Sequence, residues 1–130
     1  MTYDKINSIL LCKLVDMHHF SKEYIQQELE FWSVEAIDEI PCYCLMETMV
    51  GNYMKWIMVE NVNVAQIQLL FDTFEEMAVC DDINVRDLLQ VGFLEQLYSS
   101  KDLLTTAYKY MHPQTEVLCR ELKEYFNEPV

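Results

Sequence analysis

Glycine and proline are scarce in this chain, and that scarcity constrains its fold more than any other feature of the sequence. The 130 residues contain only two glycines and three prolines. A β-sheet protein needs a turn every few residues and uses glycine, proline and asparagine to make those turns. So few turn formers therefore favour a small number of longer elements joined by short links, and such elements are helices.

Apolar residues recur at intervals of three and four along most of the chain, which is the spacing of one face of an α-helix. We predict helices near residues 6–17, 21–32, 41–60, 64–79, 85–98, 103–110 and from 113 onward. Helix caps are predicted at Ser21, Asn63, Asn84 and His112, the last followed by a proline at the first helical position. The buried face of the last helix is predicted to contain Val117, Leu118, Leu122, Tyr125 and Phe126.

A chain of this length has the size of one domain and can bury roughly two thirds of its unfolded surface. No internal repeat or low-complexity tract divides it. We therefore predict one all-α domain over residues 1–130, a bundle of about six or seven helices. A set of HEAT-like helical hairpins is the alternative arrangement, since the portion "DDINVRDLL" is similar to the start of the second helix of such a hairpin.

The stretch "DDINVRDLLQVGFLEQL" at 81–97 places a glutamate inside an otherwise apolar helix. On a helical wheel of about 100° per residue, Glu95 falls between Leu88, Val91 and Tyr98. Burying an unpaired carboxylate costs several kcal/mol, so Glu95 must reach a partner, take a proton or open onto a surface. We predict that Glu95 is a buried structural residue that accepts hydrogen bonds from a neighbouring element.

Both glycines fall in the interior of predicted helices. Gly92 lies one turn before Glu95, and Gly51 lies inside the helix predicted at 41–60. A glycine in mid-helix costs roughly 1 kcal/mol relative to alanine. We expect another element to approach the backbone closely at both positions.

Cysteines and histidines offer a few candidate metal ligands. The chain has five cysteines, an odd number that suits free thiols better than a disulfide framework. "PCYC" supplies Cys42 and Cys44, and "MHHF" supplies His18 and His19. Neither pair follows the spacing of a known metal module. We expect no metal site and no cofactor, although the sequence leaves metal binding by these four residues open.

Charge is the strongest signal for function. Twenty-two acidic residues against nine basic ones give a net charge of −13. Such a surface repels nucleic-acid phosphates and anionic membranes and attracts basic proteins. We expect a protein partner, no nucleic acid and no membrane, with a purely solubilising role as the alternative. The candidate partner-binding residues form two acidic patches, Glu35, Asp38 and Glu39 in the first and Glu75, Glu76, Asp81 and Asp82 in the second.

The beginning of the chain, "MTYDKINSIL", lacks the basic and apolar regions of a secretory signal. The longest uncharged stretch, "NVNVAQIQLLF", is far shorter than the ~20 apolar residues of a spanning helix. We therefore expect a cytoplasmic protein.

The run "LFDTFEEMAVCDDINVRDLLQVGFLEQL", followed by "YMHPQTEVLCREL", resembles a family of small uncharacterised bacterial proteins. The family shows a recurring Val-Gly-Phe-Leu-Glu-x-Leu segment and a later Gly-Pro-x-Thr-like helix start, and its members look like immunity proteins of bacterial toxin systems. The resemblance covers about residues 64–122. His112 departs from the pattern, because it stands where the family has glycine. The matching positions are Val91, Gly92, Phe93, Leu94, Glu95, Leu97, Pro113 and Thr115.

Together these observations favour a non-catalytic protein-binding module. The resemblance implies an immunity or inhibitor protein that neutralises a basic, nuclease-like toxin through an acidic surface. A helical structural or regulatory adaptor is the second hypothesis, in which methionines such as Met46 and Met49 line a groove. A small enzyme is the third, with Glu95 as a base or with His18, His19, Asp16 and Glu23 around a metal. The sequence lacks a glycine-rich phosphate loop, an H-E-x-x-H motif and a nucleophile elbow, so we expect no catalysis.

Overall fold

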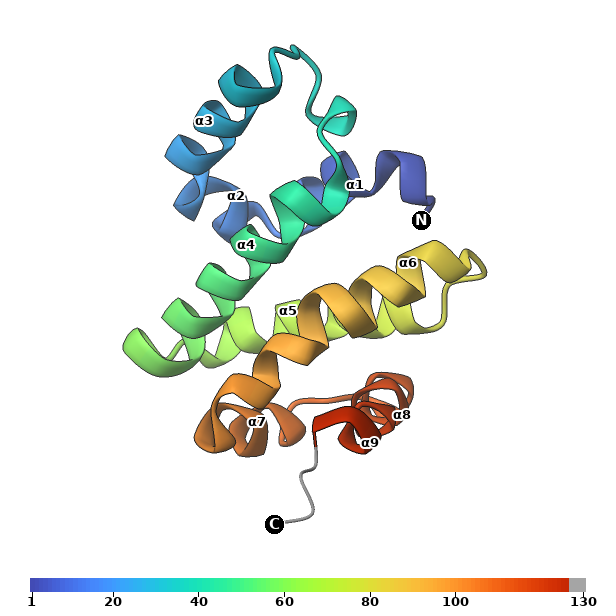
Figure 1. The fold of residues 1–130 in the computed structure, drawn as a ribbon. Helices are drawn as coiled ribbons and strands as arrows, with labels where there is room; N and C mark the ends of the chain where they lie inside the picture. The colour runs from blue at the N-terminus through green and yellow to red at the C-terminus, as the bar shows by residue number, and fades with distance from the viewer. Residues whose placement is uncertain (127–130) are drawn as a thin grey trace.

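Every regular element in the computed structural model, which describes residues 1–126, is helical (Figure 1). This confirms the predicted all-α class. In chain order the elements are η1 (Tyr3–Lys5), α1 (Ile6–Lys13), α2 (Val15–Phe20), α3 (Lys22–Trp32), η2 (Ile37–Glu39), α4 (Cys42–Lys55), η3 (Trp56–Glu60), α5 (Val64–Ala78), α6 (Ile83–Asp87), η4 (Leu88–Phe93), η5 (Leu94–Ser99), α7 (Lys101–Tyr108), α8 (Pro113–Glu121) and α9 (Lys123–Phe126). Among them η3 and η4 are π-helical, and η1, η2 and η5 are 3₁₀-helical.

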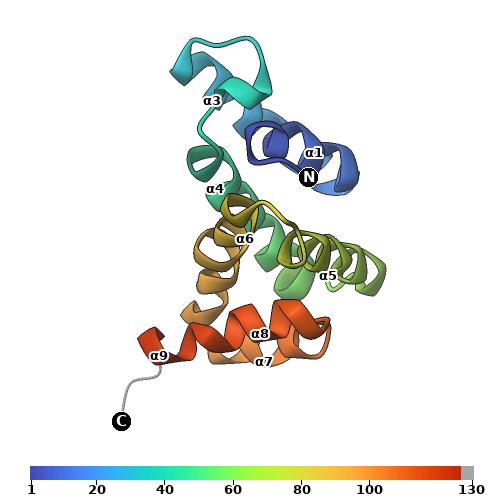
Figure 2. The same cartoon turned by 90° about the vertical axis from the view of Figure 1, so that its right-hand side faces the viewer.

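The helices lie in three tiers (Figures 1 and 2). Helices α1, α2 and α3 form one end, α4, α5 and α6 with its continuation occupy the middle, and α7, α8 and α9 form the other end. One cluster of buried apolar side chains joins the three tiers into a single all-α domain. Its largest fully buried side chains include Tyr53, Phe71, Phe74 and Phe93.

Helix starts follow the predicted capping signals at most positions. Asn63 caps α5, with its Oδ1 accepting a hydrogen bond from the Gln66 backbone N–H at 3.2 Å. His112 occupies the cap position of α8, and Pro113 is the first helical residue. The cap predicted at Asn84 is wrong, because α6 begins earlier, at Ile83. Asp82 caps that helix by accepting from the Asn84 N–H at 3.0 Å.

Three predicted helices are less regular than an α-helical pattern implies. The helix predicted at 6–17 divides at Leu14, whose φ and ψ of −108° and 68° are not helical. The helix predicted at 41–60 ends in the π-helical η3, and the one predicted at 85–98 is built mostly from η4 and η5. The chain therefore contains more, shorter segments than the six or seven predicted helices.

The close approach of another element predicted at the two glycines is confirmed at Gly51, whereas at Gly92 the neighbouring element makes only ordinary van der Waals contact. A Cβ on Gly51 would collide with the side-chain amide of Gln96. A Cβ on Gly92 would lie 3.1 Å from a methyl of Leu88 and 3.5 Å from the ring of Tyr43, which belongs to α4. Gln96 also donates hydrogen bonds to the carbonyls of Glu47 at 2.8 Å and Gly92 at 2.7 Å. Gly51 therefore allows α4 and the η4–η5 segment to cross closely.

Within residues 1–126, no helix combines the length and the apolar character that crossing a membrane requires.

Candidate functional site

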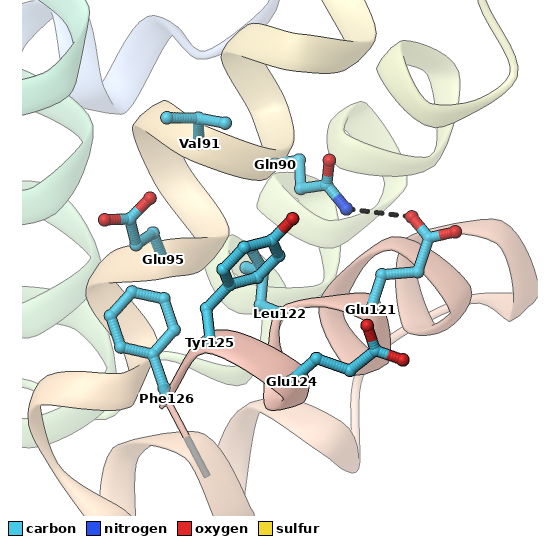
Figure 3. A pocket seen from close by; sticks show the side chains of 8 residues that line it. All are labelled: Gln90, Val91, Glu95, Glu121, Leu122, Glu124, Tyr125 and Phe126. Carbon is cyan, nitrogen blue, oxygen red and sulfur yellow. Dashed lines mark hydrogen bonds between the residues drawn. The ribbon is translucent and has the colours of Figure 1, made fainter. Parts of the chain in front are cut away.

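A groove lies between the η4–η5 segment and helices α8 and α9 (Figure 3). It consists of two adjoining hollows of about 560 and 250 Å³ that share Val91, Glu95 and Phe126. The larger hollow is lined by Gln90, Val91, Glu95, Glu121, Leu122, Glu124, Tyr125 and Phe126. The smaller one is lined by Glu47, Val91, Glu95, Gln96, Tyr98, Ser99 and Phe126. We call the two hollows together the C-terminal groove.

Glu95 faces this groove because the helix that carries it is not an α-helix. The π-helical η4 closes i→i+5 hydrogen bonds and holds more residues per turn, so side chains beyond it fall out of phase with an α-helical wheel. Val91, which the wheel places beside Glu95 in the interior, is 49% exposed. The prediction of a buried, hydrogen-bonded Glu95 is corrected accordingly. Glu95 is only partly buried, has no hydrogen-bond partner among residues 1–126, and opens onto a surface.

Carboxylates dominate the charge of the C-terminal groove. Glu95 lies on one side of the larger hollow and Glu121 and Glu124 lie on the other, with Tyr125 between them (Figure 3). Glu47 adds a fourth carboxylate in the smaller hollow. In the described part of the chain, neither hollow is lined by Lys, Arg or His. The groove is therefore a site of uncompensated negative charge.

One wall of the groove is fixed by side-chain hydrogen bonds. The Gln90 amide donates to Glu121 Oε1 at 2.9 Å, shown as the dashed line in Figure 3, and to the Leu118 carbonyl at 2.9 Å. The Tyr98 hydroxyl donates to the Cys119 carbonyl at 2.6 Å. Both residues thus connect the η4–η5 segment to α8. Burial raises the pKa of Tyr98 and of the Cys119 thiol, so both groups stay neutral at ordinary pH.

Two aromatic side chains border the groove and remain accessible. Tyr125 is 78% exposed and Phe126 is 39% exposed. The Phe126 ring stacks on Tyr98, with ring centroids 5.1 Å apart and planes inclined by 27°. The prediction that Tyr125, Phe126 and Val117 share a buried face is therefore wrong. The helix is interrupted at Leu122, between α8 and α9. The α-helical period of residues 113–121 therefore does not extend to these two aromatic residues.

Three of the seven predicted partner-binding carboxylates accept hydrogen bonds from backbone N–H groups in the first turns of helices. Asp38 accepts from the Ser8 N–H at 2.9 Å and from the Ser8 hydroxyl at 2.6 Å in the first turn of α1. Asp82 accepts from the Tyr3 N–H at 2.9 Å in addition to capping α6. The third is Glu75.

Glu75 on α5 makes the largest set of these contacts. It accepts hydrogen bonds from the Gln114 N–H at 3.1 Å, the Thr115 N–H at 2.9 Å and the Thr115 hydroxyl at 2.9 Å. These groups form the first turn of α8, where backbone N–H groups have no intrahelical acceptor. The partly buried Glu75 therefore positions α8, which is also a wall of the C-terminal groove.

The other four predicted carboxylates lie at the surface. Glu39 accepts a long hydrogen bond, 3.3 Å, from the Ala36 N–H. Glu76 pairs with Lys13 at 3.0 Å, and both side chains are well exposed. Glu35 and Asp81 are exposed as well. These four remain accessible to a partner.

The candidate metal ligands do not converge. His18 and His19 are exposed on α2, Cys42 is buried at the start of α4, and Cys44 is exposed. Asp16, one of the two carboxylates proposed beside the histidines, instead accepts a hydrogen bond from the Tyr53 hydroxyl at 2.9 Å. Across residues 1–126, no three side chains of His, Cys, Asp or Glu are grouped so as to hold a metal ion.

Sequence reasoning missed the groove residues Glu47, Glu121 and Glu124. The available signal was "ELKEYF" at 121–126, in which two glutamates stand close to two aromatics. That pattern also suits the end of an ordinary amphipathic helix, so it does not distinguish a groove from a core-facing stripe.

Comparison with known proteins places the groove inside a recognised domain. Residues 18–127 match the model of a domain family of unknown function, DUF7674. The match begins within α2 and spans α3 to α9, so it includes every residue that lines the C-terminal groove. A search of curated proteins and a search of solved structures gave no match.

Proposed function

We propose that the chain, which belongs to the DUF7674 family, is a non-catalytic protein-binding module whose partner is a basic protein. The C-terminal groove carries this proposal, because four carboxylates line it without a Lys, Arg or His among the described residues. The most specific form of the proposal is that the protein is an immunity or inhibitor protein of a bacterial toxin system. It acts in the cytoplasm and neutralises a nuclease-like toxin domain.

Electrostatics supports a basic partner. With a net charge of −13, the protein already repels further negative charge, and the carboxylates around the groove repel one another. A cation from a partner relieves that repulsion at the point of contact. Nucleases bind phosphates with clusters of Lys and Arg, so the surface of such an enzyme complements this groove.

The exposed carboxylates outside the groove have a different role in this proposal. Glu35, Glu39, Glu76 and Asp81 contribute long-range attraction that speeds encounter with the partner. Steering of this kind raises association rates by roughly 10- to 10³-fold and weakens as salt increases. The groove, by contrast, supplies the close contact that sets the lifetime of the complex.

A helical adaptor is the second candidate function. The methionine-lined groove on which the sequence-based hypothesis rested is not what favours it. Met46, Met49 and Met54 are each at most 1% exposed and belong to the core. The feature that favours an adaptor is an exposed aromatic pair at the end of α3. Phe31 is 74% exposed and packs edge-to-face against Trp32, and such aromatics are good anchors for a partner.

Growth protection and binding kinetics test the immunity proposal. If a neighbouring gene encodes a basic toxin domain, co-expression with this chain should restore growth of cells that produce the toxin. The association rate of the purified pair should fall steeply as salt rises, whereas the dissociation rate should change little. A toxic neighbour that the chain neither binds nor neutralises would refute the immunity proposal. Binding to an uncharged partner with no salt dependence would refute the basic-partner proposal as a whole.

A further inference from the structure

We propose that the C-terminal groove recognises an arginine side chain of the basic partner, held between the Glu95 carboxylate and the aromatic rings at the end of the chain. This inference rests on the proposed function and narrows it from a basic surface to a guanidinium group. Two features of the groove, a comparable contact elsewhere in the chain and the size of the groove support it.

The first feature is the state of Glu95. Its side chain is partly buried, and neither carboxylate oxygen has a hydrogen-bond donor among residues 1–126. Solvent and salt screen a sheltered charge less than a charge on an open surface. An ionised carboxylate can accept two parallel N–H bonds from a guanidinium, whereas an ammonium offers only a point charge.

The second feature is the aromatic border. Phe126 stacks on Tyr98, and the Tyr98 hydroxyl is anchored to the Cys119 carbonyl, so the stacked rings are attached to α8. Tyr125 presents a second, more exposed ring between Glu95 and Glu124 (Figure 3). Guanidinium groups are weakly hydrated and stack on aromatic faces, which makes arginine a better fit than the strongly hydrated lysine.

The third observation is a guanidinium that the chain already holds in the same manner. Arg120 on α8 lies over the ring of Tyr108, 4.6 Å from its centroid. Its Nε donates to Glu116 Oε2 at 2.8 Å. At Arg120 one carboxylate and one aromatic face thus contact the same guanidinium, and the groove offers both kinds of group without an arginine of its own in its lining.

The size of the groove argues against a bare metal ion as its occupant. The larger hollow measures about 560 Å³, which is far more space than one cation fills. A side chain with an apolar stem suits the mixed lining, because the stem can lie against Leu122 and Val91 while the charge reaches the carboxylates.

An NMR titration with three short peptides tests the inference. The peptides carry two arginines, two lysines or two citrullines around a central leucine and are otherwise identical. We expect the arginine peptide to shift the amide signals of Glu95, Gln96 and Phe126, the lysine peptide to bind several-fold more weakly, and the citrulline peptide not to bind. Equal affinity for arginine and lysine, or shifts located elsewhere on the molecule, would overturn the assignment.

Matched variants separate the groove from general charge. Glu95→Gln should weaken binding of the arginine peptide by about tenfold, which corresponds to the loss of one sheltered ion pair. Glu60→Gln, at an exposed carboxylate on η3, should leave the affinity unchanged. If Glu95→Gln proves unfolded by circular dichroism, Glu124→Gln provides the same comparison at the opposite side of the groove. Equal effects of the groove and control variants would refute the inference.

The two proposals can fail separately. Salt-sensitive binding of a whole basic protein without any arginine-peptide binding in the groove would refute the guanidinium assignment and leave the proposed function standing. Arginine-peptide binding together with failure to bind or neutralise a basic toxin would refute the immunity function and leave the groove assignment standing.

Discussion

Two regions of the molecule carry dense negative charge, and they use it in opposite ways. The α5 corner, which comprises Glu75, Glu76, Asp81 and Asp82, directs two of its four carboxylates at free backbone N–H groups. In the C-terminal groove, only Glu121 has a hydrogen-bond donor within residues 1–126, the Gln90 amide. Half of the corner carboxylates thus stabilise helix starts, whereas three of the four groove carboxylates accept no hydrogen bond within residues 1–126.

The difference follows from the local helical geometry. The first turn of a helix has N–H groups without intrahelical acceptors and a partial positive charge, so a carboxylate there is stabilised. The corner carboxylates reach such turns in η1, α6 and α8. Glu95 instead lies in the first turn of η5, which continues the helical backbone of η4 without a gap. The Leu94 N–H at this junction already donates to the carbonyls of Leu89 and Gln90, and the Glu95 side chain accepts no hydrogen bond from residues 1–126. A carboxylate at that position gains little from the fold itself.

The largest effect is expected at Glu75. Glu75→Ala removes the acceptor of three hydrogen bonds to the first turn of α8 and should lower the free energy of unfolding by about 2–3 kcal/mol. Glu75→Gln retains one acceptor oxygen and should cost less. Urea denaturation measures both.

The control is the neighbouring Glu76→Ala. Its exposed ion pair with Lys13 contributes little, so the loss should stay below about 1 kcal/mol. Equal losses at the two positions would show that the capping contacts of Glu75 do not determine stability.

A smaller effect is expected at Asp38, which caps α1 from a distant part of the chain. Asp38→Ala should cost about 1–2 kcal/mol, because it leaves the Ser8 N–H without its side-chain acceptor and leaves the Ser8 hydroxyl only the Lys5 carbonyl, 3.0 Å away. Glu39→Ala removes only a long, exposed hydrogen bond and should cost less than about 0.5 kcal/mol. The ranking is wrong if thermal melts show Glu39→Ala to be the more destabilised variant.

Alkaline pH should destabilise the protein. Burial raises the pKa of Tyr53 and Tyr98, and of the Cys42 and Cys119 thiols, above their ordinary values. These groups therefore keep their protons in the folded state at pH values where the unfolded chain loses them. Stability is intact below the unfolded pKa values and decreases above about pH 8.5 for the thiols and about pH 10 for the phenols.

Tyr98→Phe checks the contribution of the groove wall to this pH dependence. At neutral pH the variant should lose about 1 kcal/mol, because the hydrogen bond to the Cys119 carbonyl disappears. Between about pH 9 and 11 its unfolding free energy should fall less steeply than that of the wild type, since it has one phenol fewer to titrate. Parallel curves for the two proteins would show that Tyr98 titrates equally in the folded and unfolded states.

Local sequence signals predicted much of the fold. Asn63 and Pro113 mark helix starts through preferences that act over one turn, and both were placed correctly. The scarcity of glycine and proline predicted the all-α class, and Gly51 marked a close helix crossing. The cap assigned to Asn84 in place of Asp82 shows the usual uncertainty of helix boundaries, because both residues are good caps.

The candidate site was harder to predict because it depends on contacts between distant segments. Glu75 and Thr115 are 40 positions apart, so no local pattern shows that Glu75 caps α8. The position of Glu95 depends on a π-helical segment, which a wheel of fixed period cannot represent. The acidic composition predicts a partner-binding surface but does not locate it, and only the tertiary structure separates carboxylates that cap helices from those that remain unpaired.

The central claim is that the groove carboxylates serve to bind a partner and do not stabilise the fold. The most direct test is to change Glu95, Glu121 and Glu124 together to glutamine and to measure the free energy of unfolding. Glutamine preserves size and can still accept the Gln90 hydrogen bond, while the substitutions remove three mutually repelling charges. In urea denaturation, we expect the free energy of unfolding of this variant to equal or exceed that of the wild type, with any loss below about 0.5 kcal/mol. A loss of more than about 1 kcal/mol would contradict the account, because it would show that these carboxylates, like those of the α5 corner, stabilise the fold.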